Sequence, residues 1–491
     1  MNKHLPERPD LTHLKDQAKS LLTRLRSSDT VALAQVSTLN LTTPFKLADA
    51  QLAVARSYGF DSWAKLKKHV ESTVDHRAAF FKAIKSRDQK SVRTLFKQDP
   101  SLIRANDPTE FGAVPISIAA QTEDRSMIDL VLELGADING RSDWWAGGFG
   151  ALDLASEPIS KYLLLKGATL TLHAAARLGF TDEVRQFVEA DPNSVNVRGG
   201  DGQFPLHFAK SPDIVDILVN AGASLDARDI DHESTAAQWQ IRNEPVLRRL
   251  VECGATPDIF IATMLDDPAM ISAILNATPT AIEKRTAEPG DPFMPQAPGG
   301  HIYVYTLGAR QFPHMVAHHF GKANAYRYLI TKLTLTLKLL NACWLADRGQ
   351  IDSIVAEYPN IVKELSMGNA ATLADAAWHR CTNSVKLMLE LGFNPNARAS
   401  EDSTAIDRAA FHGFDDVIEA ILPYGPDLTV KNAYGGTPLR ACIYGSMHSW
   451  RKDGNFPRSV ELLIEAGSEL PDELNGSPQV KSVLKRYGVP R

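Results

Sequence analysis

The chain has 491 residues, of which 44% are hydrophobic and 23% charged, and its formal net charge at neutral pH is −5. This composition is typical of a globular protein, and the slight acidity argues against nonspecific binding to nucleic acid or to anionic membranes. The opening residues, MNKHLPERPDLTHLKDQ, lack the apolar core of a secretory signal, and no run of 18 apolar residues indicates a membrane span, so we expect a cytoplasmic protein. Four cysteines without a CxxC pair predict reduced thiols and no zinc site built on them: Cys253, Cys343, Cys381 and Cys442.

Residues 1–76 do not repeat and are predicted to form helices. Asp10 is a plausible N-cap, and the apolar residues from Leu11 to Leu25 fall on one helical face. Ser62 is predicted to cap a further helix. This segment is either a recruitment module or a helical cap, and the cap is favoured because terminal caps shield the apolar ends of repeat arrays.

From residue 77 onward the chain repeats a unit of about 33 residues, a period typical of stacked repeat proteins. Thr404 and Thr437 are one such period apart, as are Gly392 and Gly425. In the typical unit a Thr or Pro starts a tight turn into a short helix, a Gly such as Gly179 or Gly413 ends that helix, and a second amphipathic helix follows. One unit cannot bury its apolar face alone, so stacked units supply the core. We predict a first array at 77–285, an insertion with a degenerate unit and a possible hairpin at 286–332, a second array at 333–475, and a capping helix or tail at 476–491.

These units resemble a known family. VPISIAAQTEDRSMIDLVLELGADIN (114–139) and FPLHFAKSPDIVDILVNAGASLDARD (204–229) are similar to the ankyrin repeat, and the resemblance extends from Pro115 to Leu470. It implies an all-α solenoid of helix-turn-helix units with short β-turn or hairpin tips, and it implies protein–protein binding. His173 and His207 are then expected to brace turn backbones between units. The N-terminal stretch resembles the helical leader of many bacterial ankyrin-repeat proteins.

Three segments depart from the repeat. They are 140–150, with two adjacent tryptophans, 286–311, and the stretch from Thr437 to Val460, which is nine residues longer than its counterpart in the preceding unit. Alternation of Ile302, Val304 and Thr306 suggests a short strand pair in the second segment.

These departures supply the candidate binding residues. Exposed aromatic and arginine residues often anchor protein interfaces. The predicted partner-binding residues are therefore Trp144, Trp145, Tyr303, Tyr305, His448, Trp450, Arg451, Asn455 and Phe456. Self-packing of long loops against the repeats is the open alternative. Trp239, Trp344 and Trp378 lie inside repeat helices and are predicted to be packing residues.

No catalytic motif stands out. There is no phosphate-binding loop and no GxSxG, and HMVAHH (314–319) has Met315 where a metalloprotease needs Glu. We therefore predict a non-catalytic, monomeric scaffold that binds another protein, without metal or cofactor and without nucleic-acid or membrane partners. The alternative is an enzyme or small-ligand-binding protein with a site near the 286–320 insertion, using His301, His314 or His318.

Overall fold

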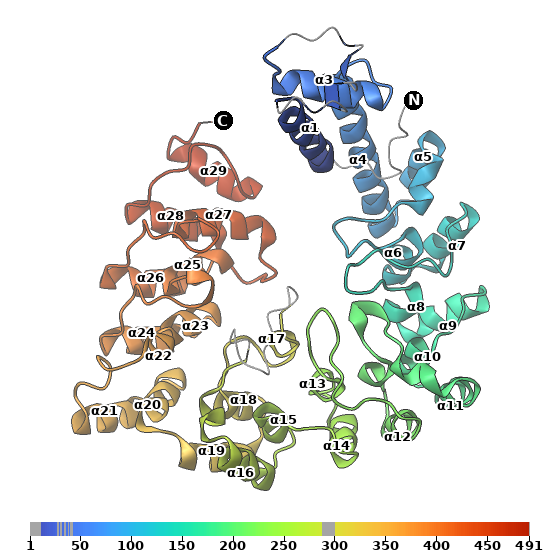
Figure 1. Cartoon of the computed structure of the whole chain (residues 1–491). Coiled ribbons are helices and arrows are strands. Elements are labelled where there is room, and N and C mark those ends of the chain that lie inside the picture. Colours follow the sequence, from blue (N-terminus) through green and yellow to red (C-terminus); the bar gives the residue numbers. More distant parts are fainter. Residues whose placement is uncertain are drawn as a thin grey trace. The chain divides into compact units, whose positions relative to one another are not determined.

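The computed structural model describes residues 11–26, 29, 32–33, 36–37, 39, 43–286 and 300–490. Every regular element in these ranges is a helix, so the described chain is all-α as predicted (Figure 1). The chain divides into two compact units, Met1–Thr256 with Ala297–Gly300, and Pro257–Gln296 with His301–Arg491. None of the described helices is both long and apolar enough to cross a bilayer.

The N-terminal helices form a small core of their own. α1 (Leu11–Arg26) packs on α3 (Leu47–Ser57) and α4 (Trp63–Lys85). Leu14 and Leu25 of α1 and Leu66 of α4 are buried together in this core. Ser62 caps α4 by accepting a hydrogen bond from the Lys65 amide, which confirms the predicted cap. The proposed cap at Asp10 lies outside the described residues.

Helix α4 also belongs to the first repeat. Its early residues Leu66 and Val70 lie in the N-terminal core, whereas Phe80 and Ile84 lie in the core that continues into the repeats. The expected boundary after residue 76 therefore falls inside one continuous helix. The shared helix α4 thus joins the N-terminal core to the core of the helix pairs that follow.

The rest of the first unit consists of short helices in pairs. They are α5 (Gln89–Gln98), η1 (Pro100–Arg104), α6 (Pro115–Gln121), α7 (Arg125–Glu133), α8 (Ala151–Leu154), α9 (Glu157–Leu165), α10 (Leu172–Leu178), α11 (Thr181–Ala190), η2 (Pro192–Asn196), η3 (Gly200–Gly202), η4 (Pro205–Phe208), α12 (Pro212–Asn220), α13 (Ala236–Trp239) and α14 (Glu244–Glu252). The first helices of successive pairs pack in a row, α4 on α6, α6 on α8, α8 on α10, and α10 on η4.

The second unit repeats this arrangement. Its helices are α15 (Ile259–Met264), α16 (Pro268–Ala277), η5 (Pro279–Glu283), α17 (Tyr303–Thr306), α18 (Pro313–His319), α19 (Ala323–Lys332), α20 (Leu335–Trp344), α21 (Arg348–Glu357), α22 (Met367–Ala370), α23 (Thr372–Trp378), α24 (Thr382–Glu390), η6 (Ser400–Asp402), α25 (Ala405–His412), α26 (Asp415–Ile421), η7 (Leu422–Tyr424), α27 (Pro438–His448), α28 (Phe456–Glu465) and α29 (Pro478–Arg486). First helices α23, α25 and α27 pack in one row, and second helices α24, α26 and α28 pack in another.

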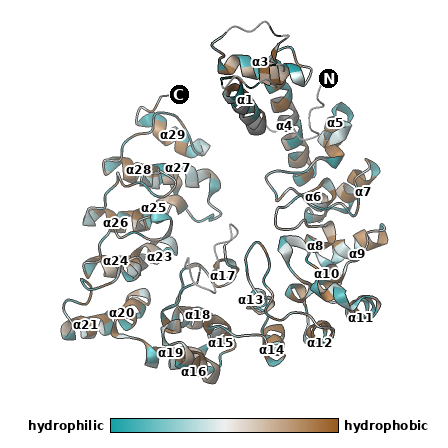
Figure 2. Ribbon diagram, viewed as in Figure 1, coloured by the Kyte–Doolittle hydropathy of each residue, from teal (hydrophilic) through white to brown (hydrophobic). Residues whose placement is uncertain are grey.

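Small and amphipathic residues explain the stacking. Ala119 and Ala120 of α6 are fully buried, and their small side chains allow the neighbouring helices α4 and α8 to approach closely. The helices mix hydrophobic and hydrophilic residues along their length in Figure 2, as expected when one face of each is buried.

Loop tips between the pairs are held by short backbone pairings and by histidine. Isolated bridges join Asp107 to Ala113 and Arg228 to Thr235. The His207 ring accepts a hydrogen bond from the Phe204 amide at Nδ1 and lies 3.1 Å from the Ser234 carbonyl at Nε2. His173 makes the corresponding contact to the Val197 carbonyl at 3.0 Å. The predicted bracing role of both histidines is confirmed.

The predicted strand around Ile302, Val304 and Thr306 is wrong. Tyr303–Thr306 forms the single helical turn α17. The Tyr303 ring is fully buried against Phe260, and its hydroxyl donates a 2.7 Å hydrogen bond to Asp258. Burying this one ring with its hydroxyl satisfied stabilises the turn, whereas a lone strand would leave its backbone groups unpaired.

Candidate protein-binding surface

Aromatic side chains occupy one position in three successive first helices of the second unit. Trp378 of α23, Phe411 of α25 and Tyr444 of α27 are each one repeat apart. The rings of Trp378 and Phe411 are stacked with centroids 6.0 Å apart, and those of Phe411 and Tyr444 are 6.4 Å apart. We predicted Trp378 to be a packing residue and did not predict this row, although an aromatic residue at the same place in consecutive repeats can be recognised in the sequence.

The long loop of the last repeat adds a further ring to this row. Trp450 lies with its centroid 5.6 Å from that of Trp378 and 6.0 Å from that of Phe411. Despite these contacts its side chain is 63% exposed. On the next helical turn, the His448 ring stacks on Tyr444 at 4.1 Å. We call Trp378, Phe411, Tyr444, His448 and Trp450 the aromatic surface.

Helix α27 and the loop that follows it are both packed closely on α25, through Gly445 and Gly454 respectively. A Cβ atom on Gly445 would lie 1.9 Å from the Phe411 carbonyl oxygen, and one on Gly454 would lie 2.0 Å from the His412 carbonyl oxygen. Any other residue would force α27 away from α25 at the first position and the loop away from α25 at the second. The nine extra residues therefore lengthen α27 to His448 and also form a loop that returns to the repeat.

Charged groups hold the loop in this position. Arg380 donates to the Asp453 carbonyl oxygen at 2.6 Å and to its carboxylate at 3.2 Å, and it also pairs with Asp416. Arg451 pairs with the same Asp453 carboxylate and lies over the Phe414 ring at 5.1 Å. These arginines hold the pKa of Asp453 below its usual value, Arg451 being the main cause. The side chain of Arg451 therefore makes contacts that hold the loop in place.

Asn455 and Phe456 are also used internally. The Asn455 side chain caps α28 by accepting from the Arg458 amide, and its Nδ2 donates to Asp415 at 2.8 Å. Phe456 is half-buried and packs over Gly413. Of the five residues predicted in this segment, His448 and Trp450 remain as exposed members of the aromatic surface.

His412 lies directly beneath Trp450. Its ring centroid is 5.0 Å from that of Trp450, and its Nδ1 lies 2.9 Å from the Ser449 hydroxyl. Burial lowers the pKa of His412 to about 4, so the imidazole is neutral near pH 7. A neutral ring allows Trp450 to pack on it without a buried charge.

The first unit carries a smaller aromatic group. Trp144 meets Phe111 edge-on at 4.9 Å and lies 6.0 Å from Trp145. Phe111 and Trp145 are 56% and 55% exposed, whereas Trp144 is half-buried. The two predicted tryptophans therefore lie together in one loop tip, next to Phe111 of the neighbouring loop, and Trp145 is the more exposed of the two.

The residues predicted near the insertion do not assemble into a surface. Tyr303 is fully buried, so it is removed from the predicted binding set, while Tyr305 is 66% exposed. His301 and His314 are 2% and 0% exposed, and His318 lies at the exposed end of α18. In this structure neither His301 nor His314 is accessible to a substrate.

A buried ionic cluster lies beside this region. The Asp375 carboxylate of α23, 2% exposed, lies 3.3 Å from Arg285 Nη1, 2.9 Å from Arg310 Nε and 2.7 Å from Arg408 Nη1. Arg408 also donates to the hydroxyls of Ser403 and Ser400. Asp375 therefore joins both sides of the insertion to the row of first helices, which is a structural role.

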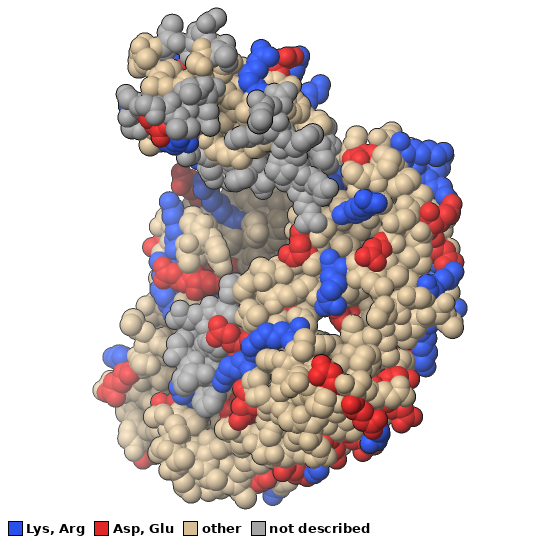
Figure 3. Space-filling model, turned by 45° about the vertical axis from the view of Figure 1, so that its right-hand side comes forward, with Lys and Arg blue, Asp and Glu red and all other residues tan. Residues whose placement is uncertain are grey.

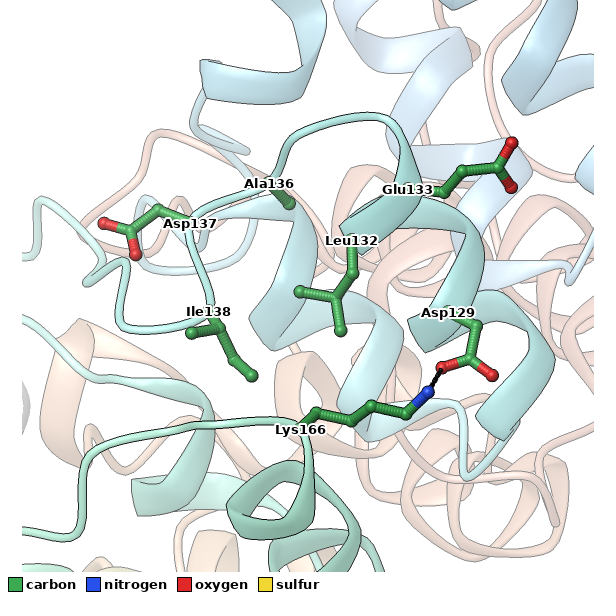
Figure 4. A pocket seen from close by; sticks show the side chains of 7 residues that line it. All are labelled: Asp129, Leu132, Glu133, Ala136, Asp137, Ile138 and Lys166. Carbon is green, nitrogen blue, oxygen red and sulfur yellow. Dashed lines mark ion pairs between the residues drawn. The ribbon is translucent and has the colours of Figure 1, made fainter.

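A pocket on the first unit offers little chemistry. It is lined by residues of α7, the following turn and Lys166 (Figure 4). Lys166 pairs with Asp129 at 2.7 Å, and the Tyr162 hydroxyl donates to the same carboxylate. Leu132 and Ile138 form its apolar wall, and Glu133 is paired with Arg93. The charged groups here are already partnered.

Comparison with known proteins agrees with the repeat geometry. The ankyrin repeat family matches residues 201–230, which run from the η3 turn through α12 to the next loop tip. This segment is therefore similar to an ankyrin repeat. The His207 brace lies inside the matched segment, so the contact to the Ser234 carbonyl links this segment to the loop that follows it.

Two spider toxins share a similar stretch. The chain is 27% identical over 157 residues to alpha-latrotoxin-Lt1a of Latrodectus tredecimguttatus, and 26% identical over 157 residues to alpha-latrotoxin-Lhe1a of Latrodectus hesperus. Each alignment covers 31% of this chain and only 9% of the toxin. The similarity is thus confined to part of the chain and to a small part of each toxin.

Proposed function

We propose that the protein is a non-catalytic ankyrin-repeat scaffold that binds another protein through the aromatic surface of its second unit. The observation that carries the proposal is the row of Trp378, Phe411 and Tyr444 with Trp450 lying across it. Exposed aromatic side chains on rigid helices supply large contact area at a small cost in conformational entropy.

The exposure of its side chains distinguishes the aromatic surface from aromatic residues that only pack in a core. Trp450, Tyr444 and the neighbouring Met447 are 63%, 55% and 53% exposed. Contiguous apolar area of this kind is rare on a surface that contacts only water, and it typically marks a binding site. The loop that presents Trp450 is held by Arg380 and Asp453, so binding would order few additional residues.

Charge favours a protein partner over a polyanion. Basic and acidic side chains are interspersed on the face seen in Figure 3, and the whole chain has a net charge of −5. Nucleic-acid-binding proteins usually gather basic residues on one face. Charges of both signs lie beside the aromatic surface, on Arg380, Arg451 and Asp453, and a surface of this kind suits an apolar segment of another protein.

Affinity purification tests the proposal. Tagged full-length protein is compared with the double variant Tyr444→Ala/Trp450→Ala and with the control Tyr424→Ala, which removes a 42%-exposed tyrosine from η7. We expect the wild type and the control to retain the same specific partner, and the double variant to lose it with an unchanged unfolding temperature. Retention of that partner by the double variant would contradict the assignment.

A further inference from the structure

Two consecutive loop tips of the first unit bring two carboxylates and an imidazole together. Asp201 lies in the η3 turn, and Asp231 and His232 lie in the loop between α12 and α13 (Figure 1). One potential ligand atom from each of the three side chains lies within 4.8 Å of the others. Among the described residues this is the one group of three or more His, Cys, Asp or Glu side chains with that geometry.

The His232 ring is oriented towards the carboxylates. Its Nδ1 lies 2.7 Å from the carbonyl oxygen of Gly300, which can only accept a hydrogen bond, so Nδ1 carries the proton. In the neutral imidazole, Nε2 then holds the lone pair. Nε2 lies 3.6 Å from Asp231 Oδ2 and 3.9 Å from Asp201 Oδ2. Metal-binding histidines are held in this way, with one nitrogen on a backbone carbonyl and the other on the ion.

The distances indicate that something belongs between these groups. Both are longer than a good N–H···O hydrogen bond, whose upper limit is about 3.2 Å, so a proton on Nε2 would not be shared with either carboxylate. Two ligand atoms on one tetrahedral Zn²⁺, each about 2.1 Å from the metal, lie about 3.4 Å apart. The observed separations are close to that spacing.

Asp231 points independently to a ligand. It is only 5% exposed, and its Oδ1 is buried with no hydrogen-bond partner among the described residues. Burying a carboxylate oxygen without a hydrogen-bond donor is unfavourable, because the oxygen loses its hydrogen bonds to water and forms none within the protein. Within the part of the chain that the structure describes, His232 lies beside the Asp201 and Asp231 carboxylates, and neither carboxylate pairs with a lysine or arginine.

Asp201 is held in place by its backbone. Its amide donates to the Gly147 carbonyl, and its carbonyl accepts from the amides of Ile230 and Asp231. The backbone contacts therefore fix a carboxylate beside a second one at a cost that a cation would offset.

Asp229, the third carboxylate of this corner, is used differently. Its oxygens accept from the Ser234 amide at 2.6 Å and from the Trp239 indole at 3.2 Å. Trp239 also packs edge-on against the His232 ring at 5.1 Å. Asp229 thus supports the loop that carries Asp231 and His232.

We propose that Asp201, Asp231 and His232 bind one divalent transition-metal cation with the ligand preference of Zn²⁺. Two carboxylates and one imidazole are a ligand set found with such ions, and a water molecule would complete the coordination. The cation would fasten two successive loop tips to each other. This inference is independent of the proposed partner-binding surface, because it concerns different residues in the other unit.

Zn²⁺ titration of the full-length protein after chelator treatment tests the site. The variants are Asp231→Asn, which keeps the side-chain shape, and His232→Gln. The matched control is Glu233→Gln, which removes a carboxylate from the same loop outside the group. We expect one Zn²⁺ per wild-type chain and a higher unfolding temperature with Zn²⁺. Affinity should fall by at least about tenfold in both variants and stay unchanged in the control.

Co²⁺ provides a measurement that needs no variant. Visible absorption of the Co²⁺-loaded wild type should show ligand-field bands without the intense near-ultraviolet band of thiolate coordination. A thiolate band would assign the ion to a cysteine and overturn the proposal. Absence of stoichiometric Zn²⁺ binding by the wild type, or full binding by both loop variants, would overturn it as well.

Discussion

Trp450 packs edge-on against Trp378, a residue two repeats earlier in the chain, with ring centroids 5.6 Å apart and an interplanar angle of 63°. Through this contact the repeat that contains α27 touches the repeat that contains α23, although the repeat of α25 lies between them. It exists because α27 is extended to His448 and the following loop returns over α25. The same geometry leaves most of the Trp450 ring in solvent.

The loop should loosen when its ionic anchor is removed. Asp453→Asn weakens the contacts to Arg451 and Arg380, which are partly exposed and contribute about 1 kcal/mol. Hydrogen exchange of residues 449–454 should therefore become about fivefold faster, with little change elsewhere. Asp472→Asn, an exposed residue outside the loop, should leave these rates unchanged. Equal rates in the Asp453 variant would show that glycine packing alone holds the loop.

Neutralising Asp375 should destabilise the second unit. Asp375→Asn leaves Arg285, Arg310 and Arg408 buried around an uncharged group. Removing one partner of a buried ion pair typically costs 3–5 kcal/mol, so we expect a loss of about 3 kcal/mol or more in the free energy of unfolding, measured in urea. Asp352→Asn, on the exposed side of α21, should change it by less than about 0.5 kcal/mol. Similar effects of the two substitutions would contradict the role of the cluster.

Replacing His314 should stabilise the protein, and more so in acid. Both ring nitrogens are buried without a hydrogen-bond partner among the described residues, so His314→Leu should add about 1 kcal/mol at pH 8.

The sign of the pH dependence follows from the pKa. Burial lowers the pKa of His314 to about 3. As the pH falls below about 6.5, the unfolded chain therefore binds a proton at this residue that the folded chain does not bind. The wild type loses stability there and the variant does not, which widens the difference by about 2 kcal/mol at pH 5. Urea unfolding at pH 5 and pH 8 measures it, and a difference independent of pH would show that the folded state protonates His314.

Asp201 should produce the opposite pH dependence in protein kept free of metal by a chelator. Its folded pKa of about 6 lies above the usual value, so between pH 4 and pH 6 the folded state keeps a proton that the unfolded state has released. Stability from this group is present below pH 4 and is lost as the pH rises through 6. Asp201→Asn removes that loss, so the variant should gain up to about 3 kcal/mol on the wild type across this range. Unfolding curves at pH 4.5 and pH 7 compare the two, and parallel pH profiles would contradict the crowded-carboxylate geometry.

Much of the repeat could be predicted from residue spacing. Helix pairs, glycine ends and bracing histidines depend on contacts within a unit or with its immediate neighbour, and a period of about 33 residues carries that information. The strand prediction at 302–306 was wrong because alternation of apolar residues does not show whether a partner strand exists. Tyr303 was misplaced for a related reason, since its environment is set by Phe260 and Asp258 from another repeat.

By itself, the sequence determined the helical repeat and the segments that are longer than the repeat requires, because both can be recognised from the order of residues along the chain. Only the tertiary structure decided which residues of those segments face solvent. It placed Phe456 and Arg451 against the repeat, joined the exposed Asn455 to Asp415 by a hydrogen bond, and left Trp450 exposed over Trp378. It also brought Asp201 to Asp231 and His232. The physical reason is that stacking aligns equivalent positions of successive units at contact distance, so side chains a full repeat apart become neighbours.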